Sequence, residues 1–391
     1  MNAGREARSS PRAGARRVVT RLAVLCVSTI VWVGAAELLL RRFAPVDEIV
    51  FELDPRRLYR PLPGARTLEM PPPGSRASPV EWQFDSRGLR GPELGPKRAG
   101  VQRVLVLGDS FIHARETPLA ETFTARLQDE LQRAGRPVES LNAGVAGYGP
   151  DQTLLRFEEE VDALAVDVVV FAVCAHNDLD DPFRNGIFAL SESGELVERE
   201  PGIDPRYAER YEHKRALAAR PMLVRWLSHL LTEQPEHAGP THAQREAWRV
   251  ASRAYAEFLG EAATDTSSDA LDALAVARAK LALFERLLAR LQAGCHARDI
   301  DFAVVVIPSS YDIVDPDPPS VSNARTGGAT SRAIASVARK LGVACLDLYP
   351  AFWERADEPL YLGAAEIHWS ARGQALAAEL AADFLGGAEK P

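Results

Sequence analysis

The chain has little of what marks a disulfide framework, a metal site or a nucleic-acid partner. It contains four cysteines in 391 residues, and neither their number nor their spacing demands disulfide bonds. No Cys-x-x-Cys pair or histidine cluster has metal-ligand spacing, so the sequence predicts no metal and no cofactor. The net charge is −8, and the basic residues form no stripe with interleaved aromatics. Nucleic acid is therefore not an expected partner.

The chain is long and apolar enough to form a globular domain. Hydrophobic residues make up 46% of the chain and charged residues 26%, which is enough to bury a proper core. No internal repeat is visible. One domain with insertions is the economical interpretation.

The N-terminus carries a topology signal. Arginines precede an uncharged run over residues 22–36, and Arg41-Arg42 follow it; these arginines are Arg5, Arg8, Arg12, Arg16, Arg17 and Arg21. The run is shorter than the roughly 20 residues of a spanning helix, but residues 18–40 are long enough.

Positive charge stays in the cytoplasm. We therefore expect a cytoplasmic basic head over residues 1–17, a transmembrane signal-anchor over residues 18–40, and the rest of the chain outside the cytoplasm, on the periplasmic side. The alternative is a cleaved signal peptide, because Gly34-Ala35-Ala36 offers the small residues at which a signal peptidase cuts.

Beyond residue 100, strand-like and helix-like segments alternate. Near-continuous apolar runs separated by helical patterns predict a parallel sheet covered on both faces, hence an α/β fold. The expected strands are 104–107, 138–142, 166–173, 302–307 and 343–348, and the expected helices include 120–131, 152–161 and 271–291.

Two segments interrupt this alternation. Residues 41–100, rich in Pro and Gly, are expected to form a linker and a lead-in hairpin. Residues 101–386 would form the main domain, with an insertion at about 179–270. Within it, residues 187–197 alternate as a hairpin does, and residues 216–231 have a helical apolar face. That face is expected to pack against the sheet, or alternatively to form a lid over a pocket.

The most informative motif is Gly108-Asp109-Ser110, directly after the first expected strand. A serine at a strand-to-helix turn is where an acyl-transfer nucleophile is presented, although a turn stabilised by its own Asp and Ser side chains has the same sequence. A serine hydroxyl needs a base to take its proton. Among eight histidines, His368 has the best context, between a loop and the amphipathic segment 373–380. The alternative is a capping or surface histidine.

Acyl transfer also needs fixed donors for the developing oxyanion. The candidates are the backbone N–H groups of Ser110 and Gly147 and the side-chain amide of Asn177. Ligands of parallel sheets bind at the carboxyl ends of the strands, where all three residues lie. Gly147 could instead be a tight-turn glycine, and Asn177 could cap the following turn.

The ordered motifs resemble the SGNH (GDSL-type) hydrolase family, membrane-anchored bacterial type, over roughly residues 80 to 386. The segment 84–91 looks like one seen in membrane-anchored members. The resemblance assigns the four residues of the family name to Ser110, Gly147, Asn177 and His368, and with the strand order implies a flavodoxin-like three-layer α/β/α fold with a five-stranded parallel sheet, preceded by the transmembrane helix.

Two positions depart from the family pattern. Ala175 stands where the family often has Gly, and Ala365 stands where its usual acid lies, three residues before the histidine. A minority pattern places the acid two residues before the histidine, which is Glu366. Glu366 is therefore the expected catalytic acid.

The resemblance leaves three functions open. The first is an extracytoplasmic serine esterase that cleaves an O-acyl ester, short-chain and on a carbohydrate or lipid, through an acyl-enzyme on Ser110. The second is an O-acyltransferase that modifies a cell-surface or exported polysaccharide with the same residues. The third is a non-catalytic, membrane-anchored binding or assembly protein.

Overall fold

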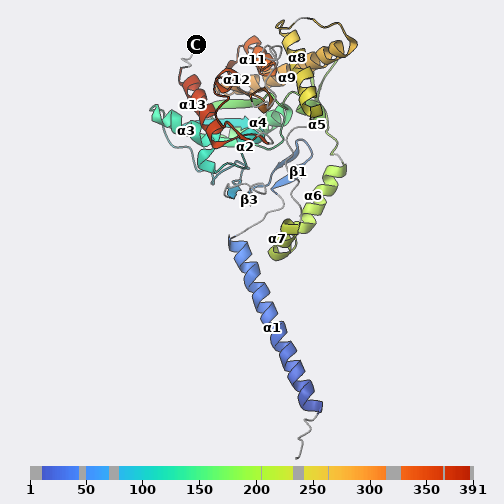
Figure 1. Ribbon diagram of the computed structural model, residues 1–391. Helices are drawn as coiled ribbons and strands as arrows, with labels where there is room; N and C mark the ends of the chain where they lie inside the picture. Colours follow the sequence, from blue (N-terminus) through green and yellow to red (C-terminus); the bar gives the residue numbers. More distant parts are fainter. Residues whose placement is uncertain are drawn as a thin grey trace, which may run out of the picture.

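The computed structural model of the protein describes residues 11–43, 50–69, 79–203, 205–231, 242–262, 264–313, 327–363 and 366–387. Most of the predicted basic head, residues 1–10, lies outside this part of the chain. The main body is an α/β domain that stands at one end of a long N-terminal helix (Figure 1).

A five-stranded parallel sheet forms the centre of the body, with strand order β11-β10-β7-β5-β6. The strands are β5 (Gln102–Gly108), β6 (Val138–Gly144), β7 (Val168–Cys174), β10 (Asp301–Ile307) and β11 (Ala344–Asp347). All the predicted strands are confirmed, with ends shifted by a few residues. In chain order this is 5-4-3-1-2, the flavodoxin-like order, which reverses direction between β5 and β7.

Helices cover both faces of the sheet (Figure 1). Alternate residues of β5 point to opposite sides, so Leu105 and Leu107 join one apolar core, and Val104 and Val106 join the other. The first core is covered by α4 (Pro150–Leu164), α9 (Ser268–His296) and α11 (Ala329–Lys340). The second is covered by α2 (Ser110–His113), α3 (Phe123–Arg133), α12 (Tyr349–Trp353) and α13 (Ala371–Gly387). The predicted three-layer architecture is confirmed.

Four short pairs of antiparallel strands lie outside the central sheet in the described part of the chain. In the lead-in segment β1 (Phe51–Asp54) pairs with β2 (Leu58–Pro61), and β3 (Arg66–Glu69) with β4 (Val80–Gln83). The predicted insertion hairpin is present as β8 (Phe188–Leu190) and β9 (Leu196–Glu198). Near the C-terminus β12 (Tyr361–Gly363) pairs with β13 (Glu366–Trp369). The insertion also contains the longer helix α8 (His242–Phe258). The remaining short elements are α5 (Asp181–Asn185), α10 (Ser310–Ile313) and a 3-10 helix over Leu119–Glu121.

The N-terminal helix α1 runs over Pro11–Phe43. Its part from Val18 to Phe43 has a mean hydropathy of 2.1, contains no fully buried residue, and is long and apolar enough to cross a membrane. A signal sequence has the same properties.

The apolar helical face expected at 216–231 lies elsewhere than predicted. The chain forms α6 (Pro205–Ala218) and α7 (Met222–Leu231), which are separated at Pro221. Helix α7 packs against α1, and Figure 1 shows it below the α/β body, away from the sheet. Amphipathic periodicity predicts that one face is covered, but it does not specify by which surface.

Candidate active site

Ser110 is the first residue of α2, directly beyond the end of β5. The turn is tight because Asp109 caps the helix, its Oδ1 accepting a 2.9 Å hydrogen bond from the N–H of Phe111. A Cβ on Gly108 would lie 2.6 Å from Ile112 Cγ1 and 3.1 Å from the carbonyl oxygen of Ala172. Only glycine allows this close approach of helix and sheet, which places Ser110 half-buried at the carboxyl edge.

His368 lies on β13, 258 residues from Ser110 in sequence, with its Nε2 2.8 Å from Ser110 Oγ. The next residue, Trp369, is 1% exposed and packs its ring 5.2 Å from that of Phe111 on α2. Side chains alternate along a strand, so burying Trp369 in the core holds His368 on the other side of β13, beside the serine. The pair has the spacing of a nucleophile and its base.

The turn after β6 brings Gly147 to the same edge of the sheet. The N–H of Val145 donates to the carbonyl oxygen of Gly108 at 3.1 Å, which ties this turn to the end of β5. Gly147 has φ +79°, a conformation that favours glycine. Tyr59 from the lead-in segment donates its hydroxyl to the carbonyl oxygen of Ala146 at 2.8 Å, and covers the turn from outside.

Asn177 follows β7, the neighbour of β5, in the turn before α5. Its Nδ2 donates to Oδ2 of Asp181 at 2.7 Å and to Oδ1 of Asp178 at 3.2 Å. The amide therefore faces carboxyl groups in this structure. To bind an oxyanion it must exchange one of these bonds, and the longer one to Asp178 is the weaker.

Four buried carboxyl groups lie in this region. Burial raises the pKa of Asp109 and raises that of Asp178 well above its ordinary value, the latter with added repulsion from Asp109 and Asp181. Burial likewise raises the pKa of Asp181 to about 7 and that of Asp151 to about 6. Burial thus disfavours the charged form of each of these carboxyl groups.

The expected acid, Glu366, is the first residue of β13. Its side chain lies outside the part of the chain whose side chains the structure describes, so its role stays a prediction.

An aromatic group beside the serine and histidine was not predicted. The His176 ring lies 4.7 Å from that of Tyr311 and 5.6 Å from that of Trp248, all three are half-buried, and His176 Nδ1 lies 3.2 Å from Ser309 Oγ. Burial lowers the pKa of His176, and the nearby His368 lowers it further. His176 and Tyr311 follow the neighbouring strands β7 and β10. Because parallel strands end at the same edge of the sheet, the sequence could have placed these two residues together. Trp248, on α8 in the insertion, carries no such signal.

Among the described residues, no group of three or more His, Cys, Asp or Glu side chains is placed to hold a metal ion.

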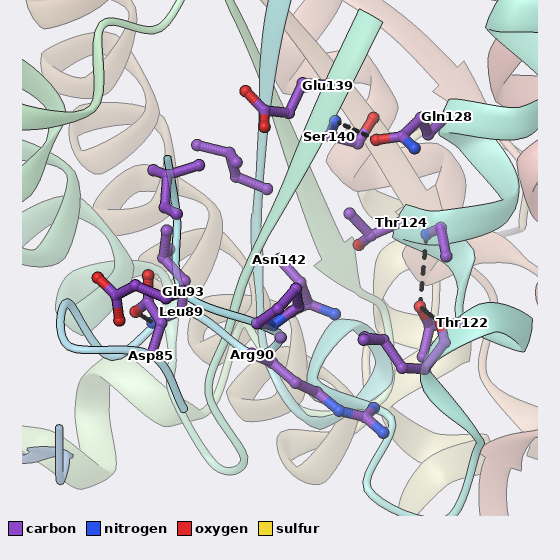
Figure 2. Close-up of a pocket in the computed structure, with 16 residues that line it drawn as sticks. Asp85, Leu89, Arg90, Glu93, Thr122, Thr124, Gln128, Glu139, Ser140 and Asn142 are labelled. Atoms are coloured by element: carbon purple, nitrogen blue, oxygen red, sulfur yellow. Dashed lines mark hydrogen bonds between the residues drawn. The ribbon is translucent and has the colours of Figure 1, made fainter. Parts of the chain in front are cut away.

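A separate hollow of about 250 Å³ lies along the edge strand β6 and α3 (Figure 2). Thr124, Gln128, Glu139 and Ser140 are among the residues that line it, and Figure 2 shows Arg90 at its other end. None of the candidate catalytic residues lines this hollow. It is therefore distinct from the site at the carboxyl edge of the sheet.

Arg90 links the lead-in segment to the helix that carries Ser110. Its guanidinium is buried and donates to the carbonyl oxygens of His113, Ala114 and Thr117, at 2.5 Å for Ala114 and 2.6 Å for Thr117. Burial lowers the pKa of Arg90 to about 10. These bonds satisfy carbonyls at and beyond the end of α2, and so fix the helix on which the serine sits.

The chain is similar in structure to several solved hydrolases, two of them described as esterases. The psychrotrophic esterase EstA from Pseudoalteromonas sp. is 10% identical with a TM-score of 0.38, over 73% of this chain and 97% of EstA. A variant of the acetylxylan esterase Axe2 from Geobacillus stearothermophilus is 13% identical with a TM-score of 0.38, over 73% and 94%. LAE5, an alpha/beta hydrolase enzyme from the metagenome of Lake Arreo, Spain, is 15% identical with a TM-score of 0.38, over 74% and 97%. No curated protein matches the sequence.

The fold and the serine–histidine pair are those of a serine hydrolase built on an α/β sheet. Residues 106–376, more than half of the chain, match the model of the GDSL-like lipase/acylhydrolase family. The chain belongs to this family, and the predicted resemblance is confirmed. It is a serine hydrolase that acts on ester bonds.

Proposed function

We propose that the protein is an extracytoplasmic, membrane-anchored esterase that removes an O-acyl group through an acyl-enzyme on Ser110. The observation that carries this proposal is the 2.8 Å approach of His368 Nε2 to Ser110 Oγ at the carboxyl edge of the sheet. The substrate would be a short acyl ester on a carbohydrate or lipid.

In the proposed first step Ser110 Oγ attacks the ester carbonyl carbon while His368 Nε2 takes the hydroxyl proton. The carbonyl oxygen becomes an oxyanion. The proposed donors to it are the N–H groups of Ser110 and Gly147 and the amide of Asn177, each of which can contribute a few kcal/mol. Asn177 would reach the oxyanion by giving up its 3.2 Å bond to Asp178.

In the second step the imidazolium of His368 donates its proton to the leaving alcohol oxygen, and the ester bond breaks. Water then attacks the acyl-enzyme, with His368 again acting first as base and then as acid, and the carboxylic acid leaves. Glu366 is proposed to accept a hydrogen bond from the other ring nitrogen of His368, which would fix the tautomer and stabilise the imidazolium.

The proposed location follows from the charge around α1. The arginines before the apolar segment favour a cytoplasmic N-terminus, so the body would lie on the opposite, periplasmic side. The C-terminal end of α1 is tied to α7. Glu37 accepts hydrogen bonds from the N–H groups of Met222 and Leu223, both at 2.9 Å, so α1 is part of the folded structure there.

The aromatic group supports a substrate with a flat apolar face. His176, which interacts electrostatically with His368, packs with Trp248 and Tyr311, so the three offer half-buried ring surface, and each side chain also carries a polar atom. This surface could bind the ring of an acylated sugar while its ester reaches Ser110.

The test is turnover of a panel of acyl esters by the purified full-length protein and its Ser110→Ala variant, in detergent, with and without an oligosaccharide acceptor. We expect release of the free acid, strongest for acetylated sugars, and none from Ser110→Ala. Acyl transfer to the oligosaccharide in place of acid release would instead identify an acyltransferase. Absence of both would contradict an enzymatic role.

A reporter fused after residue 100 tests the location. An enzyme reporter that works only outside the cytoplasm should be active, and the fusion should sediment with membranes. A reporter signal in the cytoplasm would refute the proposed sidedness, and a soluble extracytoplasmic product would show cleavage near Ala36.

A further inference from the structure

We infer that α7 (Met222–Leu231) is a second membrane attachment, an amphipathic helix that lies in the surface of the bilayer that α1 crosses. The inference rests on the proposed membrane anchoring of α1. It adds a lipid-binding surface, formed by the exposed face of α7, to a body that would otherwise be held by a single tether.

The point at which α7 is attached along α1 determines the depth of α7 in the bilayer. The Glu37 carboxylate accepts hydrogen bonds from the N–H groups of Met222 and Leu223, and so fixes the start of α7 to α1. From Val18 to Glu37 a helix rises about 29 Å, close to the roughly 30 Å of the hydrocarbon core. A span that begins at Val18 therefore places Glu37, and with it the start of α7, at the outer boundary of the hydrocarbon.

The face of α1 that meets α7 is the one that is partly covered. Ala36, Glu37 and Leu40 are half-buried, whereas Leu38 and Leu39 remain exposed. Ala36 and Glu37 lie four and three residues before Leu40, so these positions face the same side of the helix. Packing on this stripe leaves the opposite side of α1 for lipid.

Among the residues of α7 whose side chains the structure describes, the other side carries exposed apolar residues. Val224 and Leu227, three residues apart on one face, are each 44% exposed, while Met222 is 6% exposed on the covered side. Figure 1 shows α6 and α7 extending from the body toward the upper end of α1.

The surroundings of this apolar face suit a lipid headgroup region. Exposed cations lie at the ends of the two neighbouring helices and just before α7, namely Arg41, Arg42, Arg215 and Arg220. An apolar face flanked by basic residues at the height of a bilayer boundary is the pattern of an interfacial helix. We therefore assign a lipid surface, rather than a second protein, as the occupant.

The test uses the full-length protein in phosphatidylcholine vesicles, with an environment-sensitive NBD dye on single introduced cysteines. The background carries Cys26→Ser and Cys345→Ser, because Cys26 is exposed and Cys345 half-buried. The probe position is Leu227→Cys on α7. Val276→Cys on α9 is the matched control, a 52% exposed apolar residue of the body, and Val31→Cys reports on α1 itself.

We expect at least a twofold gain in emission at position 227 on reconstitution, and strong quenching there by lipid that carries a nitroxide near its headgroup. Position 31 lies about 9 Å deeper than Glu37, so quenching there is measured with lipid that carries the nitroxide on its acyl chain. Position 276 should show neither effect. Glu37→Ala should reduce quenching at position 227 by at least half and leave position 31 unchanged, because it removes the tie to α7 and, within α1, only the ion pair with Arg41.

The control positions separate the ways in which the inference can fail. Quenching at 31 but not at 227 would refute the attachment of α7 and leave the α1 anchor intact. A shielded, unquenched dye at 227 whose emission depends on protein concentration would show that a second copy covers the face. No quenching at 31 would overturn both the anchor and the attachment.

Discussion

Replacing Gly147 by alanine tests how the turn after β6 is held beside Ser110. A Cβ at this position would lie 2.8 Å from the hydroxyl oxygen of Tyr59, and the φ of +79° is unfavourable for any residue with a Cβ. Tyr59 would have to move, and its 2.8 Å hydrogen bond to the carbonyl oxygen of Ala146 would be lost.

The expected cost has two parts. Left-handed backbone costs an alanine about 1–2 kcal/mol, and loss of the tyrosine bond adds about 1 kcal/mol. Alanine also lowers the conformational entropy of the unfolded chain, which offsets about 0.4–1 kcal/mol of this destabilisation. Gly147→Ala should therefore lower the free energy of unfolding by about 2 kcal/mol. Gly135→Ala is the matched control, because Gly135 has φ +81° but open space around it, and it should cost about 1 kcal/mol less.

Urea unfolding of the full-length protein in detergent measures these differences, and turnover of a soluble ester measures the effect on the site. Gly147→Ala keeps the backbone N–H but should displace this proposed oxyanion donor, so turnover should fall at least tenfold, compared with the about 10²–10³-fold cost of losing one donor completely. In a Tyr59→Phe background the clash is absent, so the additional cost of Gly147→Ala should fall by about 1 kcal/mol. Equal stability and equal turnover for Gly147→Ala and Gly135→Ala would refute this reasoning.

Three further substitutions have defined expectations. Glu366→Gln should lower turnover by at least about tenfold, a loss of about 1.4 kcal/mol in transition-state stabilisation, with part retained in Glu366→Asp; unchanged rates in both would show that another group orients His368. Burial raises the pKa of Asp181 to about 7, so the folded state keeps a proton that the unfolded chain loses near pH 4, and stability falls between pH 4 and 7. Asp181→Asn should flatten this fall by up to about 1.4 kcal/mol per pH unit in urea unfolding; an unchanged slope would contradict the raised pKa. A Cβ on Gly144 would lie 2.3 Å from the backbone nitrogen of His113, so Gly144→Ala should prevent stable folding, as judged by circular dichroism and protease resistance, whereas Gly95→Ala, in open space, should fold normally.

The sheet could be predicted because a strand buried on both faces must be apolar along its whole length. The run Val168–Cys174 is fully buried, and neither helical nor alternating patterns fit it. Ser110 and Asn177 could be placed together because each follows a strand, and parallel strands end at one edge. The partner of Ser110 could be chosen by the local context of His368, but the 2.8 Å distance depends on the burial of Trp369.

Features that depend on tertiary packing could not be predicted. Nothing local in residues 222–231 says that α7 packs on α1, since its pattern specifies an apolar face and not the surface that covers it. The same holds for Trp248, whose contact with His176 depends on where the insertion folds back. The hydrogen bonds from Asn177 to Asp178 and Asp181 were also missed, because the sequence alone indicated a donor and not the acceptors that it meets.

The central claim is that Ser110 is the activated nucleophile, and covalent labelling with a fluorophosphonate probe tests it most directly. We predict labelling of the wild type at Ser110, located by mass spectrometry of the labelled peptide, and no labelling of Ser110→Ala or His368→Ala at unchanged circular dichroism. Ser191→Ala, on the exposed hairpin between β8 and β9, should label as the wild type does. Labelling that persists in folded Ser110→Ala would place the nucleophile elsewhere and contradict the proposed mechanism.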